Sequence, residues 1–263
     1  MRLITSKENQ IYRLCVRLSA RKYRQKYGEY LIEGEKMVRE AVKTGQCLKI
    51  VVAAESNKNA DTVLEQISCE TVKAADSLFA QMTQTENSQG ILAVVQKEEI
   101  DESVFRKKIR EKQGNVILLD RLQDPGNIGT IIRTADAAGY SGVMTIKGTA
   151  DLYSPKIVRA AAGSLFRMPV FSADSSEEAV RILEAEGKTI IATGFETEIF
   201  YYDAELTENV GLIIGNEGNG ISAELMQMAH KIVKIPMSGE IDSLNAAVAA
   251  GILMYESIRE NRL

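Results

Sequence analysis

The chain has 263 residues, of which 45% are hydrophobic and 26% are charged, a balance typical of a folded and soluble protein. This length allows two ordinary domains or one large one. There are three widely spaced cysteines (Cys15, Cys47 and Cys69) without a CxxC pair, and one histidine, so we expect reduced thiols and no metal site. No apolar run has the length of a signal-peptide core or a membrane span, which favours a cytoplasmic protein without a membrane partner.

The formal net charge of −4 is distributed unevenly. Between Arg2 and Lys26 there are eight basic side chains and one acidic side chain, a net charge of +7, so the remainder of the chain carries −11. A basic segment on an acidic body favours a polyanionic partner that is bound at one end. A solvated helix face would have the same composition, so charge alone leaves both interpretations open.

The first half of the chain alternates helical and extended patterns, which predicts a small α/β domain over residues 1–97. Residues 7–18 are predicted to form a helix, because their apolar side chains recur on one helical face. The other predicted elements are strands at 30–32, 48–53 and 91–95 and helices at 34–43, 60–67 and 75–81.

A highly charged segment, residues 98–114, is predicted to be a connecting helix or linker, and residues 115–263 form the second predicted domain. Its strands are continuous apolar runs, as expected for a parallel sheet that is covered on both faces. This doubly wound pattern places ligands beyond the carboxyl ends of the strands. The predicted strands are 116–119, 143–146, 189–192, 212–214 and 232–235, and the predicted helices are 128–139, 175–187, 222–229 and 245–260.

Three segments that follow strands carry candidate chemistry, and the first is residues 119–139. The tetrapeptide from Asp124 to Asn127 has the composition of a turn and a helix start. Arg133 follows in the early half of that helix, where a guanidinium can hold a phosphate bidentately with about 1.5–3 kcal/mol. A surface salt bridge, worth about 0–1 kcal/mol, is the alternative.

The second segment, residues 212–222, runs from an apolar strand into Gly215, Gly218 and Gly220. Its spacing is not that of the dinucleotide-binding fingerprint, and Glu217 among the glycines would repel a phosphate. We therefore expect a ligand that lacks phosphates, or a carboxylate placed beside a polar group. A tight strand-to-helix turn without a ligand is the alternative.

The third segment, residues 235–256, leaves a strand at Pro236 and enters the last helix. The connecting loop contains Ser238, Gly239, Ser243 and Asn245. Ser243 is predicted to cap the helix, because a serine hydroxyl accepts hydrogen bonds from free amides of the first turn.

Taken together, three sequences resemble, in order and spacing, the signature motifs of the SpoU (TrmH-like) family of ribose 2′-O-methyltransferases in the SPOUT superfamily. They are NIGTIIRTADAAG, GNEGNGIS and IPMSGEIDSLNAAVA. The first half is similar to a small substrate-binding domain like ribosomal protein L30e. The resemblance implies an α/β fold whose parallel-sheet domain carries a deep trefoil knot, a homodimer, and S-adenosylmethionine as cofactor. The residues that it implies around the cofactor are Thr193, Gly194, Gly215, Ile235, Met237 and Leu244.

The resemblance further implies that Arg133 is the main catalytic residue and that Asn127, Glu217, Ser243 and Asn245 surround it. Arginine is a poor base, because it stays protonated above about pH 12. We therefore expect Arg133 to bind a substrate phosphate and orient the ribose hydroxyl, while positioning supplies much of the rate. Ribosomal RNA, most plausibly 23S, is the expected substrate by analogy alone, and transfer RNA is the alternative.

Two other classes of function compete with this interpretation. A non-catalytic RNA-binding module would not need Asn127, Arg133, Glu217 and Asn245 together. A Rossmann-type methyltransferase or an NAD-dependent dehydrogenase would need a glycine-rich turn after the strand at 116–119, where residues 120–123 are DRLQ instead.

RNA contacts are predicted on the basic amino-terminal segment, at Arg21, Lys22 and Arg24. Four tyrosines interleave with these cations, and bases stack on such rings at about 1–3 kcal/mol each. Core packing is the alternative for Tyr12 and Tyr30. His230 is predicted to lie on a helix in a structural or surface role.

Overall fold

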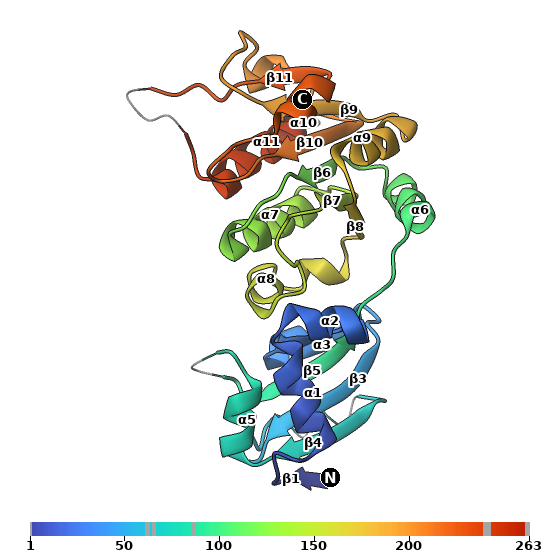
Figure 1. Ribbon diagram of the computed structural model, residues 1–263, viewed down its shortest axis with the longest axis vertical. Coiled ribbons are helices and arrows are strands. Elements are labelled where there is room, and N and C mark those ends of the chain that lie inside the picture. The colour runs from blue at the N-terminus through green and yellow to red at the C-terminus, as the bar shows by residue number, and fades with distance from the viewer. Residues whose placement is uncertain (1, 61–63, 65–66, 86–87, 239–242, 261–263) are drawn as a thin grey trace. The chain divides into compact units, whose positions relative to one another are not determined.

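The computed structural model describes residues 2–60, 64, 67–85, 88–238 and 243–260 and forms two compact units (Figure 1). Unit 1 comprises Met1–Glu99 and Asp151–Phe166, and unit 2 comprises Ile100–Ala150 and Arg167–Leu263. Among the described residues, no helix has both the length and the apolar character needed to cross a membrane. The same residues contain no group of three or more His, Cys, Asp or Glu side chains suited to a metal ion.

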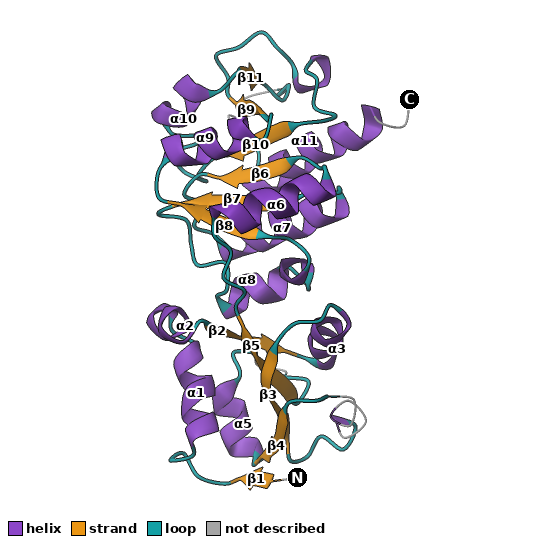
Figure 2. Ribbon diagram, turned by 90° about the vertical axis from the view of Figure 1, so that its right-hand side faces the viewer, coloured by secondary structure: helices purple, strands orange, loops and turns teal. Residues whose placement is uncertain are grey.

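Unit 1 is built on a five-stranded mixed sheet in the order β1-β4-β3-β5-β2. The strands β1, β3 and β4 run parallel, and β5 is antiparallel to both β3 and β2. Helices α1 and α5 lie on one side of this sheet and α3 on the other (Figure 2). The strands are β1 Arg2–Ile4, β2 Glu29–Glu33, β3 Leu48–Ala54, β4 Glu70–Ala74 and β5 Ile91–Gln96, and the helices are α1 Gln10–Leu18, α2 Arg21–Tyr27, α3 Glu35–Lys43, α5 Asp76–Met82 and α8 Pro155–Ala160.

Three predicted strands and three predicted helices of the first half are confirmed with shifts of a few residues, and most of the helix predicted at 60–67 lies outside the described residues. The elements β1, β4 and α2 escaped prediction. The sequence of β4 is ETVKA and that of α2 is RKYRQKY, so neither has the apolar periodicity that identifies an element. The strand β1 has only three residues.

The core of unit 1 lies between the sheet, α1 and α5. Tyr12 and Tyr30 are buried, which decides between stacking and core packing for these two rings. Cys15 is a free thiol in this core, and burial raises its pKa to about 12, so it stays protonated at neutral pH.

Residues Asp151–Phe166 pack within unit 1, although in sequence they fall inside the second predicted domain. The Tyr153 ring lies 4.9 Å from the Tyr30 ring, and the Gln46 side chain donates a hydrogen bond to the Phe166 carbonyl at 3.2 Å. An apolar strand pattern and a linker cannot reveal that this segment packs in unit 1, because its packing depends on contacts between residues more than 100 positions apart.

Arg24 also contacts the segment Asp151–Phe166. Its position shows that the prediction of Arg24 as an RNA contact is wrong. Its side chain is 7% exposed, and its Nη2 lies 2.7 Å from the carboxylate of Asp151. Its Nη1 donates to the carbonyls of Leu18 and Ser19, both at 2.7 Å. Arg24 therefore has a structural role, while the neighbouring Arg21 and Lys22 are exposed.

Replacing Arg24 by alanine is expected to lower the free energy of unfolding by about 3–5 kcal/mol, because Asp151 would stay behind as an unpaired, largely buried charge. Arg21→Ala on the same helix is the matched control and should change stability by less than about 0.5 kcal/mol. Chemical denaturation of both variants measures the difference. Equal effects would contradict the structural role of Arg24.

Unit 2 contains a six-stranded, all-parallel sheet in the order β11-β9-β10-β6-β7-β8. Every residue of β6 and β10 is buried, which confirms the predicted parallel sheet with both faces covered. Helices α7 and α11 lie on one side of the sheet, and α6 and α9 lie on the other (Figure 1). The strands are β6 Val116–Leu119, β7 Gly142–Ile146, β8 Val170–Ala173, β9 Thr189–Thr193, β10 Val210–Ile214 and β11 Lys231–Val233, and the helices are α6 Glu102–Lys112, α7 Pro125–Ala137, α9 Ser176–Ala185, α10 Ala223–Met228 and α11 Ala246–Glu260.

The predicted linker contains a helix of unit 2. Helix α6 occupies most of it and buries Phe105 and Ile109 in the core that α9, α10 and the sheet share. Strand β8 and helix α8 escaped prediction, because β8 is partly exposed and four residues long, and α8 has only six residues. His230 follows α10 in an irregular segment instead of lying on a helix, and its Nδ1 accepts a hydrogen bond from the Ile190 amide at 2.9 Å.

Candidate active site

All the candidate catalytic and cofactor-binding residues belong to unit 2, and the first group lies where β6 gives way to α7. Asp124 caps α7 by accepting a hydrogen bond from the Asn127 amide at 2.7 Å, and Pro125 occupies the first turn. Proline suits this position because its missing N–H would have no helical partner. The helix therefore starts three residues before the predicted bound, and Asn127 lies in its first turn.

Glu217 is held by amides of this same loop. Its Oε1 accepts from the Asp124 amide at 3.0 Å and from the Asn127 side chain at 3.3 Å, and its Oε2 accepts from the Gln123 amide at 3.1 Å. Partial burial on its own would raise the pKa of Glu217, but these hydrogen bonds outweigh it and bring the pKa below 4.5. Glu217 is therefore a carboxylate at neutral pH, beside polar groups as the sequence predicts.

Asn245 connects the third motif to the first. Its Nδ2 donates to the Asn127 Oδ1 at 2.9 Å, while its own Oδ1 accepts from the Ala247 amide at 2.9 Å and the Val248 amide at 3.3 Å. Asn245 thus caps α11, and the prediction of Ser243 as the cap is wrong. Asparagine is as good a cap as serine, and only the structure shows which of the two meets the free amides.

The Asn127 side chain is therefore fixed from both sides, since its Nδ2 donates to Glu217 and its Oδ1 accepts from Asn245. The structure brings one residue of each motif into a single hydrogen-bonded chain. We call Asn127, Glu217 and Asn245 the motif network. Its members are separated by as many as 118 positions in sequence.

The loop between β10 and α10 is organised by Asn216, which the sequence interpretation did not single out. Its backbone exchanges two hydrogen bonds with Gly220, both of 2.9 Å. Its side chain accepts from the amides of Gly218 at 3.0 Å and Asn219 at 3.1 Å, and donates to the Arg121 carbonyl at 2.9 Å. An asparagine among glycines is typical of a turn that hydrogen-bonds its own backbone, so the signal was present in the sequence.

Asp120 is the second residue that the sequence interpretation missed. It is 1% exposed at the end of β6, and its Oδ2 accepts from the Ser222 amide at 2.7 Å, which ties the start of α10 to β6. The next residue, Arg121, has a φ of 57°, a conformation that is uncommon for a residue with a side chain. Its carbonyl is the one that Asn216 holds, so this unusual conformation serves to join the two loops.

The predicted cofactor-binding residues lie at the carboxyl ends of neighbouring strands. In the sheet β9 lies between β10 and β11, so Thr193 at the end of β9 and Gly194 after it lie between Gly215 and Ile235. The Gly194 amide donates to the Val233 carbonyl at 3.0 Å, which continues the β9–β11 pairing beyond the strand. Met237 is half-buried, Leu244 is exposed, and residues 239–242 between them lie outside the described residues.

This edge of the sheet fits an uncharged or cationic ligand better than a phosphate. The six predicted residues carry no charge, and the ionised member of the motif network is the carboxylate of Glu217. A Cβ added to Gly194 would lie 3.0 Å from Ile232 and Met226 side chains, so the backbone is closely surrounded there. An adenosine with a sulfonium group suits such surroundings.

Arg133 and Ser243 are not part of the motif network. Arg133 lies six residues after Asn127 on α7, about 9 Å further along the helix axis. Its side chain is exposed, and it forms no hydrogen bond or ion pair within the described part of the chain. Ser243 is exposed two residues before Asn245.

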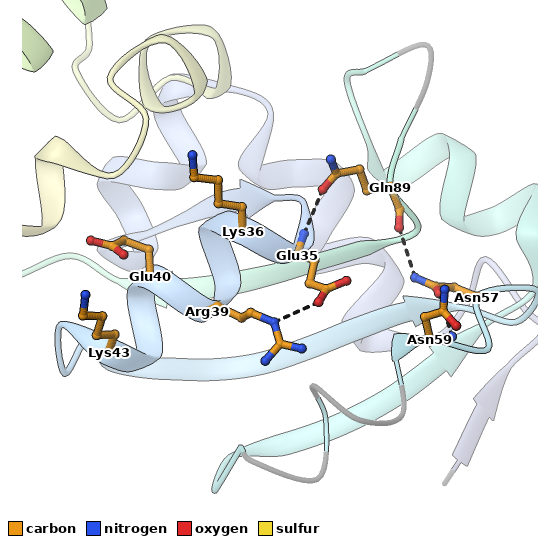
Figure 3. A pocket seen from close by; sticks show the side chains of 8 residues that line it. All are labelled: Glu35, Lys36, Arg39, Glu40, Lys43, Asn57, Asn59 and Gln89. Carbon is orange, nitrogen blue, oxygen red and sulfur yellow. Dashed lines mark hydrogen bonds and ion pairs between the residues drawn. The ribbon is translucent and has the colours of Figure 1, made fainter.

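Unit 1 has a hollow of about 570 Å³ beside α3, lined by side chains of both charges and by amides (Figure 3). Arg39 donates to Glu35 at 2.8 Å, and the Glu35 amide donates to Gln89 at 3.1 Å. None of the three motifs contributes to this hollow, so it is separate from the candidate active site.

Comparisons with protein families match two stretches of the chain. Residues 114–255 match the SpoU rRNA Methylase family, and residues 9–93 match the MRM3-like substrate binding domain. The first match contains all five candidate catalytic residues, and the second lies wholly within unit 1.

Several relatives match over nearly their whole length. The 23S rRNA (guanosine(2553)-2′-O)-methyltransferase RlmP of Bacillus subtilis is 36% identical over 97% of this chain and 98% of its own. The 23S rRNA (uridine(2479)-2′-O)-methyltransferase of Streptomyces viridochromogenes is 33% identical over 98% and 92%. A crystal structure of an AdoMet-bound rRNA methyltransferase from Sinorhizobium meliloti superimposes with a TM-score of 0.88 at 30% identity, covering 98% of each chain. The three motifs, their hydrogen-bonded arrangement and these comparisons show that the chain belongs to the SpoU rRNA methylase family.

Proposed function

We propose that this protein is an S-adenosylmethionine-dependent methyltransferase that modifies a ribose 2′-hydroxyl of 23S ribosomal RNA. The motif network carries the proposal, because it joins the three family motifs in one place beside the carboxyl ends of β6 and β10. The names of the relatives from Bacillus subtilis and Streptomyces viridochromogenes support 23S ribosomal RNA as the substrate class. The alternatives are a transfer RNA substrate and a non-catalytic RNA-binding module.

S-adenosylmethionine supplies an activated methyl group, so the protein has to bind the cofactor, align it with the ribose hydroxyl and exclude water. Thr193, Gly194, Gly215, Ile235, Met237 and Leu244 are proposed to bind it, largely through backbone atoms. The glycine-rich loop allows a ligand to approach the main chain, and Asn216 keeps that loop in one conformation.

Glu217 is proposed to act by positioning. Its two oxygens already accept three hydrogen bonds, and its lowered pKa makes it a weak proton acceptor at neutral pH. It holds the amides of Gln123 and Asp124 and so fixes the start of α7, the helix that carries Arg133. Arg133 is proposed to bind a phosphate of the RNA and orient the ribose hydroxyl, with Ser243 and Asn245 around it as the family resemblance implies.

The proposed activity is tested by mapping ribose methylation across ribosomal and transfer RNA in cells with and without the gene, and by transfer of labelled methyl groups in vitro. A single 2′-O-methyl group that disappears from 23S ribosomal RNA is the expected result. Loss of a mark from transfer RNA alone would replace the proposed substrate. Unchanged marks on both RNAs, with no transfer in vitro, would favour the non-catalytic module.

Glu217→Gln is expected to lower activity at least about tenfold, because the new NH2 group would face an amide donor where an oxygen accepts. The folded pKa of Glu217 lies below 4.5, so its stabilising contribution is complete above that pH and is lost as the pH falls through the folded pKa. Thermal melts of wild type and Glu217→Gln at successively lower pH, starting from pH 7, should therefore converge as the pH falls. A constant difference over this range would show that the carboxylate is not held by the amides.

We also propose a homodimer, a trefoil knot in unit 2 and a cytoplasmic location, together with domains at residues 1–97 and 115–263. For the dimer, Val248 and Tyr255 are seven residues apart on one face of α11 and are each 51% exposed. Such an apolar stripe favours a partner, and a second copy is the one that the family resemblance implies. Light scattering of wild type and Val248→Asp tests this, with a monomeric variant as the expected result.

A further inference from the structure

A ladder of aromatic rings and cations lies on the surface of unit 1, over α1 and α2. Tyr23 and Tyr27 are one turn apart on α2, and their rings are 6.1 Å apart with an interplanar angle of 11°. Arg17 and Lys22 lie over the Tyr23 ring at 5.6 and 4.8 Å, and Lys26 lies over the Tyr27 ring at 5.6 Å. We call this group the tyrosine ladder.

The two rings differ in how far the fold needs them. Tyr27 packs against the core of unit 1, so part of its ring has a structural role. Tyr23 is half-buried and is not among the residues that pack on that core. Tyr23 is thus the ring of the ladder that the core does not use, and it stacks on the Tyr27 ring.

The cations of the tyrosine ladder keep their charge available. Arg13 on α1 is paired with Glu8, and Arg24 on α2 is paired with Asp151. In the described part of the chain, Arg17, Lys22 and Lys26 are exposed and form no ion pair with an acidic side chain. The positive charge of this segment is therefore neutralised at Arg13 and Arg24 and remains unpaired beside the two rings.

We propose that Tyr23, with Arg17 and Lys22, is a stacking site for an unpaired base of the RNA substrate. A half-buried ring flanked by unpaired cations offers a base a π-face and offers the phosphates beside that base their counterions. A duplex keeps its bases stacked inside, so the site selects a loop, bulge or single strand. The Lys22 ammonium is flexible and weakly held, so it moves from the ring to a phosphate as the base takes its place.

This inference rests on the proposed function, because it names the kind of RNA segment that the same protein recognises. It assigns to unit 1 a base-stacking role centred on Tyr23, in addition to the electrostatic contact predicted for Arg21. The contributions of the ring and of the charges can be measured separately, the first as single-strand affinity and the second as salt dependence.

The experiment measures the affinity of the full-length protein for a fluorescent single-stranded RNA and for its duplex, over a range of salt concentrations. Tyr23→Ala should weaken single-strand binding about 5- to 100-fold without changing the salt dependence, and duplex binding should hardly change. Tyr23→Phe keeps the ring and should bind like wild type. Thermal melts check that each variant is folded.

The charges are tested with a matched pair on α1. Arg17→Ala should reduce the slope of log affinity against log salt by about 0.7, the value for one phosphate contact on a single strand. Arg13→Ala, four residues earlier and already paired with Glu8, should leave the slope close to that of wild type.

Equal single-strand affinity of Tyr23→Ala and wild type would overturn the inference. An equal loss of affinity for duplex RNA, or for an acidic peptide measured in parallel, would overturn it as well. Binding of S-adenosylmethionine is measured alongside and should be the same in every variant. If wild type binds the methyl donor and methylates ribosomal RNA while Tyr23→Ala does both equally well, the stacking site fails and the proposed function stands. If wild type binds RNA through Tyr23 without methylating it, the proposed function fails and the stacking site stands.

Discussion

Gly215→Ala is expected to weaken binding of S-adenosylmethionine at least about tenfold and to lower stability by about 1–3 kcal/mol. A Cβ added at this position would lie 2.3 Å from the carbonyl carbon of Gly220 and 2.3 Å from the amide nitrogen of Ile221. Both are main-chain atoms, so no side-chain rotation relieves the overlap. The loop has to move, and the two hydrogen bonds between Asn216 and Gly220 move with it.

The displacement of this loop also affects Glu217, because Glu217 lies within the loop. Its hydrogen bonds to the Gln123 and Asp124 amides are 3.1 and 3.0 Å long and have little room to stretch. Calorimetry with the methyl donor and methyl transfer to ribosomal RNA should therefore decline together in Gly215→Ala.

Gly218→Ala is the matched control for this variant. It adds the same methyl group to the same loop, yet the nearest atom, the Asn216 Oδ1, would be 3.6 Å away, which is an ordinary contact. We expect nearly wild-type binding of the donor. Wild-type binding by Gly215→Ala, or an equal loss in both variants, would contradict a role for the close approach of Gly215 to Gly220.

Arg133→Lys is expected to reduce kcat/KM for methyl transfer at least about 100-fold, although the variant keeps its positive charge. A lysine ammonium is a point charge and lacks the planar fork that holds a phosphate bidentately and fixes its orientation. Small errors in the position of a reacting hydroxyl cost factors of this size. Because Arg133 is exposed and outside the motif network, stability and donor binding should stay unchanged.

Arg110→Lys is the control for the chemistry of the substitution itself. Arg110 is also exposed and also forms a fork, with Nε at 2.5 Å and Nη2 at 2.7 Å from Glu186, but its partner is a carboxylate of the protein. Its replacement should leave kcat/KM within about twofold, since Arg110 lies outside the motif network and Glu186 keeps its second partner, Arg106. Near-normal turnover of Arg133→Lys would remove Arg133 from the centre of the mechanism.

Local chemistry in the sequence was sufficient for much of the parallel-sheet unit. The apolar runs of β6 and β10 predict buried strands, and Asp124 to Asn127 indicate a helix start within three residues of the observed one, because a strand or a cap depends on residues within a few positions. The same local signals were too weak for β4 and α2, whose polar compositions leave their faces to be decided by neighbours. Arg24 shows the limit most clearly, since its charge suggested RNA and its fold-determined partner is Asp151.

The sequence by itself determined the two α/β units, the order of the three motifs and the residue types that a methyl donor and a phosphate require. Only the tertiary structure decided that Glu217 accepts from Gln123 and Asp124, that Asn245 donates to Asn127, and that Asp151–Phe166 packs in unit 1. Helix caps, turns and periodicity depend on neighbouring residues, whereas these contacts join positions about 90 or more apart, which no local pattern brings together.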